Sequence, residues 1–356
     1  MSAVSYKCPN CDGPLTLDPA TGLLQCDYCG SSFTEEQVDA PDGQQDSWQE
    51  PEDPGAPEPN AEQQAYSQQA QVYSCPSCGA QIITDATTAA TTCVFCHNPV
   101  VLSQQVSGEL APDHIIPFAV TDEAAANIFQ RWCKSKLFLD PKFVHQAKKA
   151  RFTGIYYPYW IVDALFSSDV QAQGRKQRVW RQGNTEYTEH STYQVQRSGR
   201  VHFWDFLIPA LTDEETSLVQ LVYPYDFSAR KPFSMGFLSG FFARRRTRDD
   251  RVAMDIARTQ LTPEAQRQIV QGITGVGAVS VQSHQEQVLS SRTDYTLVPA
   301  WVMSVDYRGK NYRCLINGQT GQIAGDLPVS NGRLWGLFGG IFAGVLILLL
   351  IARWLA

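Results

Sequence analysis

The chain has 356 residues, of which 43% are hydrophobic and 18% charged, and its formal net charge is −7. This balance excludes a wholly disordered or collagen-like protein and leaves room for two or three domains. Residues 35–72 hold ten acids and no Lys or Arg, whereas residues 101–333 are mildly basic. The overall charge therefore does not indicate a basic nucleic-acid binder.

Eight of the ten cysteines lie in the first 100 residues and form two copies of one pattern. Each copy is Cys-x2-Cys, fourteen residues, then Cys-x2-Cys, and the second copy follows the first by 67 positions. The N-terminus shows no apolar signal-peptide region, so we expect a reducing compartment, in which such pairs are metal ligands rather than disulfides. The modules span residues 6–33 and 73–100.

Two Cys-x2-Cys turns brought together supply four thiolates in a tetrahedron, which suits Zn²⁺. A complete set of four cysteines leaves no open position, so we expect two structural zinc ions per chain and no catalytic metal. Disulfides, a redox pair or rubredoxin-like iron are the alternatives. The predicted ligands are Cys8, Cys11, Cys26 and Cys29 in the first ribbon, and Cys75, Cys78, Cys93 and Cys96 in the second.

Residues 34–72 separate the two modules and are rich in Pro, Gln, Glu and Asp. Their low apolar content predicts a disordered, extended linker. Residues 101–330 form the globular body, and the predicted fold class is α+β with more strand than helix. The chain would thus consist of two small zinc ribbons, a strand-rich α+β body and one C-terminal transmembrane helix.

Within the body, helices are expected at 121–138 and 247–271, with a new segment starting near Pro263. Arg308-Gly309 predicts a hairpin and residues 317–321 a further turn. Residues 157–162 resemble residues 298–303, which suggests two related strands in one sheet. The expected strands are 155–166, 169–182, 186–205, 218–223, 276–282, 296–307 and 310–316.

Residues 334–352 are apolar and uncharged, and about 28 Å of helix would nearly match the ~30 Å hydrocarbon core. This predicts a transmembrane tail anchor with the bulk of the chain in the cytoplasm, in preference to a buried core helix. The expected location is therefore the cytoplasmic membrane, with a single pass. Gly336, Gly340 and Gly344 share one helix face and predict self-association, with lipid-facing glycines of no consequence as the alternative.

A second apolar stretch, residues 237–243, is followed by five arginines between 244 and 251. It is open to three interpretations: contact with an anionic membrane surface, a core helix followed by a solvated charged face, or nucleic-acid contact by the arginines. No P-loop, GxSxG, HExxH or GxGxxG motif occurs. The unpaired Cys133 and Cys314 are expected to be buried apolar residues, and we do not expect an enzyme.

Four further segments carry a family resemblance: 114–118 (HIIPF), 154–160 (GIYYPYW), 237–241 (FLSGF) and 317–323 (NGQTGQI). With the CPxC ribbons, they make the chain similar to bacterial membrane-anchored proteins with a TFIIB-type zinc ribbon, the YdjG type, often labelled primosomal protein N′ (PriA) helicase-like. The resemblance implies an accessory role beside SPFH (flotillin-like) and phage-shock-type proteins in envelope stress. It implies no catalytic residues.

These observations predict a non-enzymatic, tail-anchored adaptor whose zinc ribbons recruit a protein partner, an SPFH or flotillin-like protein by the resemblance, to the cytoplasmic membrane. Neither ribbon is basic, and phosphate binding needs clustered cations. The alternative is a membrane-tethered zinc-ribbon protein that binds nucleic acid through the ribbons and the arginines of 244–251. A membrane-associated enzyme is the third class.

Overall fold

The computed structural model describes residues 5–38, 70–78, 81–85, 87–93, 98–107, 110–148, 150–212 and 219–355. Most of the predicted linker and one predicted ligand, Cys96, lie outside these ranges. The described ends of the linker are regular: η1 (Glu35–Gln37) follows the first ribbon, and β4 (Ala70–Ser74) leads into the second.

A ten-stranded mixed sheet forms the body, with the order β11-β8-β13-β9-β12-β6-β7; β10 pairs with β9, β14 with β13, and β15 with β14. The body is therefore α+β and rich in strand. The shorter strands are β6 (Thr88–Thr92), β7 (Pro99–Val101), β8 (His114–Ile115), β11 (Lys231–Pro232), β12 (Phe242–Arg244), β14 (Lys310–Asn317) and β15 (Ile323–Gly325). The separate small sheets are β1 (Leu15–Leu17), β2 (Leu24–Cys26) and β3 (Ser32–Phe33), and β4 with β5 (Gln81–Asp85).

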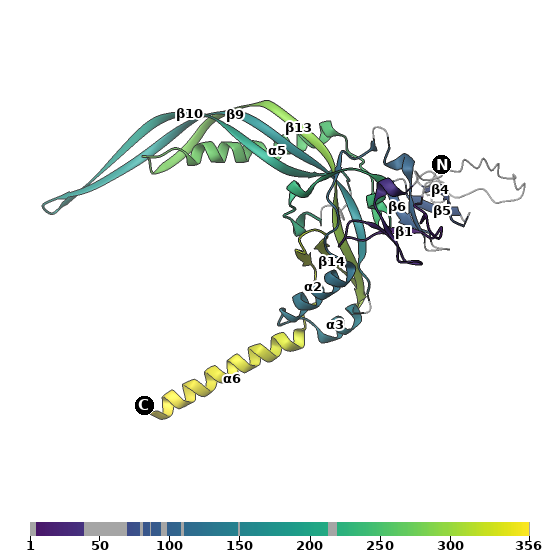
Figure 1. Ribbon diagram of the computed structural model, residues 1–356. Coiled ribbons are helices and arrows are strands. Elements are labelled where there is room, and N and C mark those ends of the chain that lie inside the picture. The colour runs from purple at the N-terminus through teal and green to yellow at the C-terminus, as the bar shows by residue number, and fades with distance from the viewer. Residues whose placement is uncertain are drawn as a thin grey trace, which may run out of the picture.

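Three long strands leave the body as a curved arm (Figure 1). They are β9 (Thr153–Gln182), β10 (Thr185–Pro209) and β13 (Ala278–Tyr307), and a 30-residue strand covers roughly 100 Å. From the sequence we expect shorter strands in place of β9 and β13, because the alternation of apolar residues stops part-way along each. In the structure, backbone pairing between the two strands makes each of them continuous. The related segments 157–162 and 298–303 do lie on adjacent strands of one sheet.

Helices cover parts of this framework. The helices α2 (Asp122–Lys134) and α3 (Pro141–Ala147) begin at Thr121 and Asp140, whose side chains accept hydrogen bonds from backbone N–H groups two or three residues on. The predicted second helix is α5 (Asp250–Gln271), which lies along the arm and passes through Pro263 without interruption. The arm helix is therefore one segment rather than two.

One expected strand is wrong. Residues 220–222 form the 3-10 helix η4 (Gln220–Val222) instead of a strand over 218–223. Val219 and Val222, three positions apart, are both buried, which is the spacing of a 3-10 turn and not the alternation of a strand. The remaining short turns are η2 (Ser103–Gln105), η5 (Phe227–Ala229) and η6 (Met235–Leu238).

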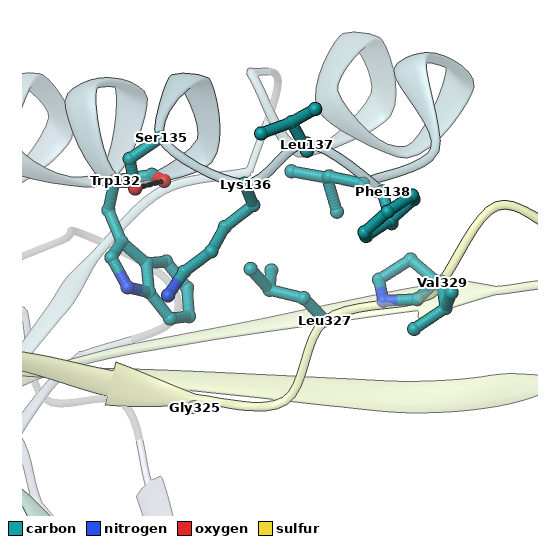
Figure 2. A pocket seen from close by; sticks show the side chains of 10 residues that line it. Trp132, Ser135, Lys136, Leu137, Phe138, Gly325, Leu327 and Val329 are labelled. Carbon is teal, nitrogen blue, oxygen red and sulfur yellow. Dashed lines mark hydrogen bonds between the residues drawn. The ribbon is translucent and has the colours of Figure 1, made fainter. Parts of the chain in front are cut away.

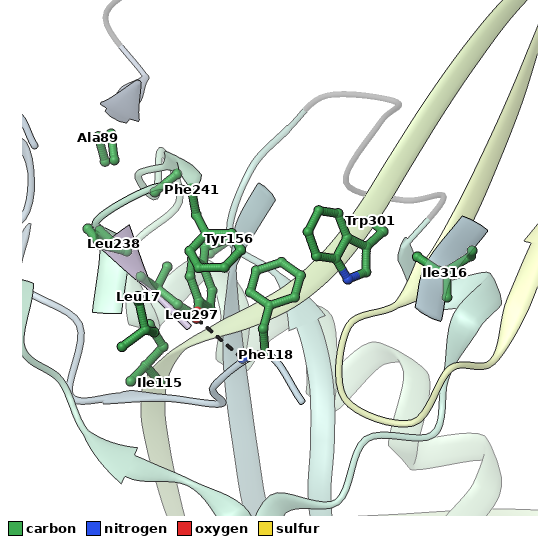
Figure 3. Close-up of a cluster of buried hydrophobic side chains, with 14 of the residues drawn as sticks. Leu17, Ala89, Ile115, Phe118, Tyr156, Leu238, Phe241, Leu297, Trp301 and Ile316 are labelled. Carbon is green, nitrogen blue, oxygen red and sulfur yellow. Dashed lines mark hydrogen bonds between the residues drawn. The ribbon is translucent and has the colours of Figure 1, made fainter. Parts of the chain in front are cut away.

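The main core lies where the ribbons meet the central sheet (Figure 3). Phe118 stacks on Phe241 with ring centroids 4.3 Å apart, and Tyr156 meets Phe118 edge-on at 5.0 Å. The same cluster includes Leu17 from the first ribbon and Ala89 from the second. The first ribbon and strand β6 of the second ribbon therefore belong to the main core, whereas Tyr73, Ile82 and Leu102 lie in a separate cluster at the second ribbon.

The final helix, α6 (Asn331–Leu355), corrects the prediction of a membrane anchor. Within the described part of the chain, no helix is long and apolar enough to cross a membrane. The transmembrane tail anchor at 334–352 and the single-pass location at the cytoplasmic membrane are therefore wrong by this criterion.

Helix α6 extends away from the body (Figure 1). No described heavy atom outside the helix's own backbone lies within 4 Å of a Cβ built on Gly336, Gly340 or Gly344. Self-association through this glycine face stays a prediction.

Candidate metal centres

Each described cysteine turn of the first ribbon has the same backbone geometry. The N–H of Cys8 donates to the carbonyl of Gly13 (2.7 Å), and the N–H of Cys26 donates to that of Ser31 (2.9 Å). The fourth residue after each of these cysteines has positive φ: Asp12 at 60° and Gly30 at 71°. Gly30 adopts this conformation without steric cost, whereas Asp12 is one of the few side chains that tolerate it.

These turns bring four sulfurs of the first ribbon together. The Sγ atoms of Cys8, Cys11, Cys26 and Cys29 all lie within 4.8 Å of one another. Cys8 and Cys29 are 3.6 Å apart, and Cys11 and Cys26 are 3.4 Å apart. A disulfide needs about 2.05 Å, whereas four sulfurs around a tetrahedral ion at about 2.3 Å are roughly 3.8 Å apart. The set therefore fits a metal ion and not two disulfides.

Protonation within this cluster is uneven. Hydrogen bonding with the Ser31 hydroxyl and backbone lowers the pKa of the Cys29 thiol to about 6. The backbone N–H of Gly13 favours the Cys11 thiolate, but hydrogen bonding with Cys26 and Cys29 outweighs it and raises the pKa of Cys11 to about 12. Four thiolates at this spacing need a shared cation, so metal binding and proton release are coupled.

The second ribbon brings together Cys75, Cys78 and Cys93, with 3.8 Å between the Sγ atoms of the last two. The N–H of Cys93 donates to the carbonyl of Asn98 (2.9 Å), as in the two turns of the first ribbon. The predicted fourth ligand, Cys96, lies outside the described residues. Both cysteine clusters can hold a metal ion. The other two cysteines, Cys133 and Cys314, are buried and belong to neither cluster.

The first ribbon is attached to the body through residues 237–243, the apolar stretch for which the sequence allows three interpretations. The N–H of Leu17 donates to the carbonyl of Ser239 (3.1 Å), and Ser239 Oγ donates to the carbonyl of Leu15 (2.5 Å). Gly240 (φ 88°) lies against Thr16, and a Cβ there would meet the threonine side chain at 3.1 Å. The apolar stretch is therefore a docking segment in which Leu238, Ser239, Phe241 and Ala243 are buried. It is made of η6 and β12 and is not the core helix that was one of the three interpretations.

A carboxylate completes this attachment. The side chain of Glu35, just after the ribbon, accepts hydrogen bonds from Ser234 Oγ, from the Gly236 N–H (3.1 Å) and from the Tyr6 hydroxyl (3.2 Å). Burial first, and then the negative charge of Glu35, raise the pKa of Tyr6 above its usual range. Glu35 therefore joins both ends of the first ribbon to the turn at η6.

The second ribbon is joined to the same segment by strand pairing. Strand β12 pairs in parallel with β9 and antiparallel with β6, with Ala243 opposite Ala90. Beyond β6, the N–H of Arg245 donates to the carbonyl of Thr87 (2.8 Å). Residues 237–245 therefore contact both ribbons, so the described parts of the two ribbons are components of the body.

The first ribbon contacts the body on one side, and its two cysteine turns face solvent on the other. The Tyr28 side chain, between Cys26 and Cys29, is 77% exposed. Asp12 is exposed at the other turn, where Lys7 is 3.9 Å away, and Asp27 is also exposed. This surface, the ribbon tip, carries the Tyr28 ring beside two exposed acids and Lys7.

Three of the arginines between 244 and 251 make contacts within the protein. Arg244 donates to Thr87 Oγ1 (2.9 Å), and Arg248 donates to the carbonyl of Pro209 (3.0 Å). The guanidinium of Arg246 lies over the rings of Trp160 (5.2 Å) and Tyr295 (5.6 Å). These side chains hold the segment around β12 in place.

Two hollows were not foreseen from the sequence. One, about 340 Å³, lies between the loop after α2 and residues 325–329 (Figure 2). Its lining combines apolar and polar surface and includes Trp132 and Leu327, with Lys136 as its one charged lining residue. The other, about 490 Å³, lies between the first ribbon and η6 and is lined by Leu24, Glu36 and Phe237 among others. Each hollow is lined by segments that are distant in the sequence, so no local sequence motif predicts it.

Comparison with known proteins gives one relative. The chain is 29% identical over 348 residues to the uncharacterized protein YdjG of Bacillus subtilis (strain 168), which covers 97% of this chain and 96% of YdjG. The chain is therefore similar to YdjG over nearly the whole length of both proteins. This similarity supports neither the helicase-like label nor an association with SPFH proteins. No family model matches the chain, and no solved structure matches it.

Proposed function

We propose that this chain is a non-enzymatic adaptor, in which two zinc ribbons fixed to a β-rich body recruit a protein partner. The observation that carries this proposal is the ribbon tip. A closed set of four cysteines holds an exposed tyrosine and acids in place, and the ribbon behind them is joined to the body by Glu35 and Ser239. A fixed, solvent-facing aromatic residue is typical of a contact point for another protein.

Zinc is the metal we propose for both clusters. Thiolates are soft ligands, and a tetrahedral S₄ set favours zinc or iron. The ion would hold the turns together and supply folding energy to modules with small cores of their own. The ion itself would not bind a substrate, because four cysteine ligands leave no coordination position open. A partner would therefore contact the surface of the chain and not the metal.

The partner class follows from the charge of the ribbon tip. Asp27 precedes Tyr28, and Asp12 adjoins Gly13, on which a Cβ would lie 3.0 Å from the Tyr28 ring. The tip therefore suits a basic segment, whose cations can pair with the acids and stack on the ring. By the YdjG-type resemblance, we propose an SPFH or flotillin-like protein acting in envelope stress as the first partner to test. Nucleic acid is less suited to this tip, because phosphates would meet carboxylates.

The proposal is tested by affinity capture of the tagged full-length chain from its own cells, with and without nuclease. The variant Tyr28→Ala removes the exposed ring and leaves all eight predicted ligand cysteines, and Tyr223→Ala serves as a control at another exposed tyrosine. We expect a protein that survives nuclease and is lost with Tyr28→Ala only. Capture that depends on nucleic acid, or that is equal in both variants, would contradict the proposal.

A further inference from the structure

The end of the arm is a two-stranded hairpin with an open edge. Strand β13 pairs with β9 only as far as Ala278 opposite Arg175, whereas β10 continues to pair with β9 up to Gln182 opposite Thr185. From Lys176 to Gln182, no described strand pairs with the β13 side of β9, and all these residues are exposed. The edge of β9 that pairs with β13 along the arm is therefore unpaired from Lys176 to Gln182 among the described residues.

The open edge is strongly basic. Residues 176–182 read Lys-Gln-Arg-Val-Trp-Arg-Gln, with three cations and no acid. The opposite strand carries the acids: Arg181 pairs with Glu186 at 3.3 Å, and Arg178 lies opposite Glu189. The β9 edge would therefore attract an acidic strand, while the acids of β10 would repel it from the other edge.

One face of the hairpin adds apolar contact area. Trp180 stacks on its cross-strand neighbour Tyr187, with centroids 5.6 Å apart and planes within 14°, and the Arg178 guanidinium lies 5.7 Å from the tryptophan ring centroid. By strand alternation, this face continues the one that carries Val170 and Ala172, where Ala265 and Ile269 of α5 cover it. Helix α5 ends at Gln271, so the aromatic end of the face stays uncovered.

We propose that the open edge of β9, residues 176–182, binds an extended acidic segment of a partner protein as an added strand. Main-chain hydrogen bonds along the edge would supply affinity. Acids opposite Lys176 and Arg178, and an apolar side chain opposite Trp180, would supply specificity. The occupant is not a second copy of this edge, because cations on an edge strand oppose pairing with an identical strand. This site is distinct from the ribbon tip.

The test uses the full-length, zinc-loaded chain and a fluorescein-labelled decapeptide, the Glu/Val peptide, read by anisotropy at low salt. One strand face of this peptide carries Val, Glu, Glu and Val in succession, with Thr at the intervening positions, so that Glu can lie opposite Lys176 and Arg178 and Val opposite Trp180 in either strand direction. We expect the Glu/Val peptide to bind, and the matching Lys/Val peptide to bind at least tenfold more weakly. A Glu/Val peptide N-methylated at alternate residues should lose binding, because it cannot complete the strand ladder. Equal binding of the N-methylated and unmodified peptides would overturn strand addition.

Charge variants locate the site. The double variants K176E/R178E and the milder K176Q/R178Q should each weaken peptide binding, the first by at least tenfold. The matched pair R151E/K310E changes two exposed cations away from the arm tip and should leave binding unchanged. Equal weakening by both Glu pairs would overturn the proposal. So would a twelve-nucleotide oligo-dT that displaces the peptide and binds more tightly at the same residues, because it would assign the edge to nucleic acid.

Discussion

Ser239 and Leu15 lie 224 positions apart, yet Ser239 Oγ donates a buried hydrogen bond to the Leu15 carbonyl at 2.5 Å. The Ser239 carbonyl in turn accepts from the N–H of Leu17 at 3.1 Å. Ser239 of the body thus makes two hydrogen bonds to strand β1 of the first ribbon. The first ribbon is therefore held in one orientation, whatever conformation the acidic linker adopts.

Removing one buried ligand should remove one metal ion. We expect the wild-type chain to contain two zinc ions and Cys26→Ser to contain one, because three thiolates hold zinc much more weakly than four. Elemental analysis of the purified full-length chain measures this directly. Cys133→Ser, at a buried cysteine outside both clusters, should retain two ions. Iron in place of zinc, or loss of metal in both variants, would contradict the assignment.

The attachment of the ribbon should contribute to stability through Glu35. Glu35→Ala leaves the Gly236 N–H and the Ser234 and Tyr6 hydroxyls without their shared acceptor, which should cost about 2 kcal/mol. Glu36→Ala, at the exposed neighbouring residue, should change stability by less than about 0.5 kcal/mol. Urea unfolding at constant zinc distinguishes the two. Equal effects would show that Glu35 does not anchor the ribbon.

How much of this could be predicted from the sequence depends on the range of the interactions. The cysteine sites follow from local spacing, and the Arg308-Gly309 hairpin follows from two residues that adopt positive φ, at 52° and 75°. The docking of the ribbons could not be predicted, because it joins short segments with no periodicity of their own. The stretch 237–243 has the composition of a membrane-facing or core element. Only its contacts with Leu15 and Thr16 show that it packs against the first ribbon.

The turn after β14 shows a motif whose role became clear only in three dimensions. Asn317 is fully buried, donates to the carbonyls of Val222 (2.9 Å) and Pro224 (3.1 Å), and accepts from the N–H groups of Gln319 and Thr320. The sequence predicted the turn but not its link to residues 222–224. Asn317 therefore makes hydrogen bonds both within the turn and to residues outside it.

Asn317→Ala should consequently destabilise the body by about 3 kcal/mol, because it leaves buried carbonyl and N–H groups unpaired. Gln319→Ala removes hydrogen bonds to Asp226 at the surface and should cost less than about 1 kcal/mol. Urea midpoints of the two variants measure the difference. A smaller effect for Asn317 than for Gln319 would contradict this role.

Asp140, which begins α3, should make stability depend on pH. The N–H of Lys142 first, and the charge of Arg308 as well, lower the pKa of its carboxyl below the usual value. A lowered folded pKa gives stability that is present above the unfolded pKa, about 3.9, and is lost as the pH falls through the folded value. Asp140→Asn should therefore be less stable than wild type at pH 7, and the difference should shrink below pH ~4. A difference that does not change with pH would contradict this.

Hydrogen exchange with and without zinc tests most directly that the first ribbon is a fixed part of the body. We expect chelation to remove protection from backbone amides of residues 15–26 and, together with them, of 235–243, because η6 and β12 are held against the ribbon by Ser239 and Glu35. Residues 296–307 of β13 should keep their protection as an internal control. Loss confined to the ribbon, with 235–243 still protected, would show that the ribbon moves independently of the body and is not a fixed part of it.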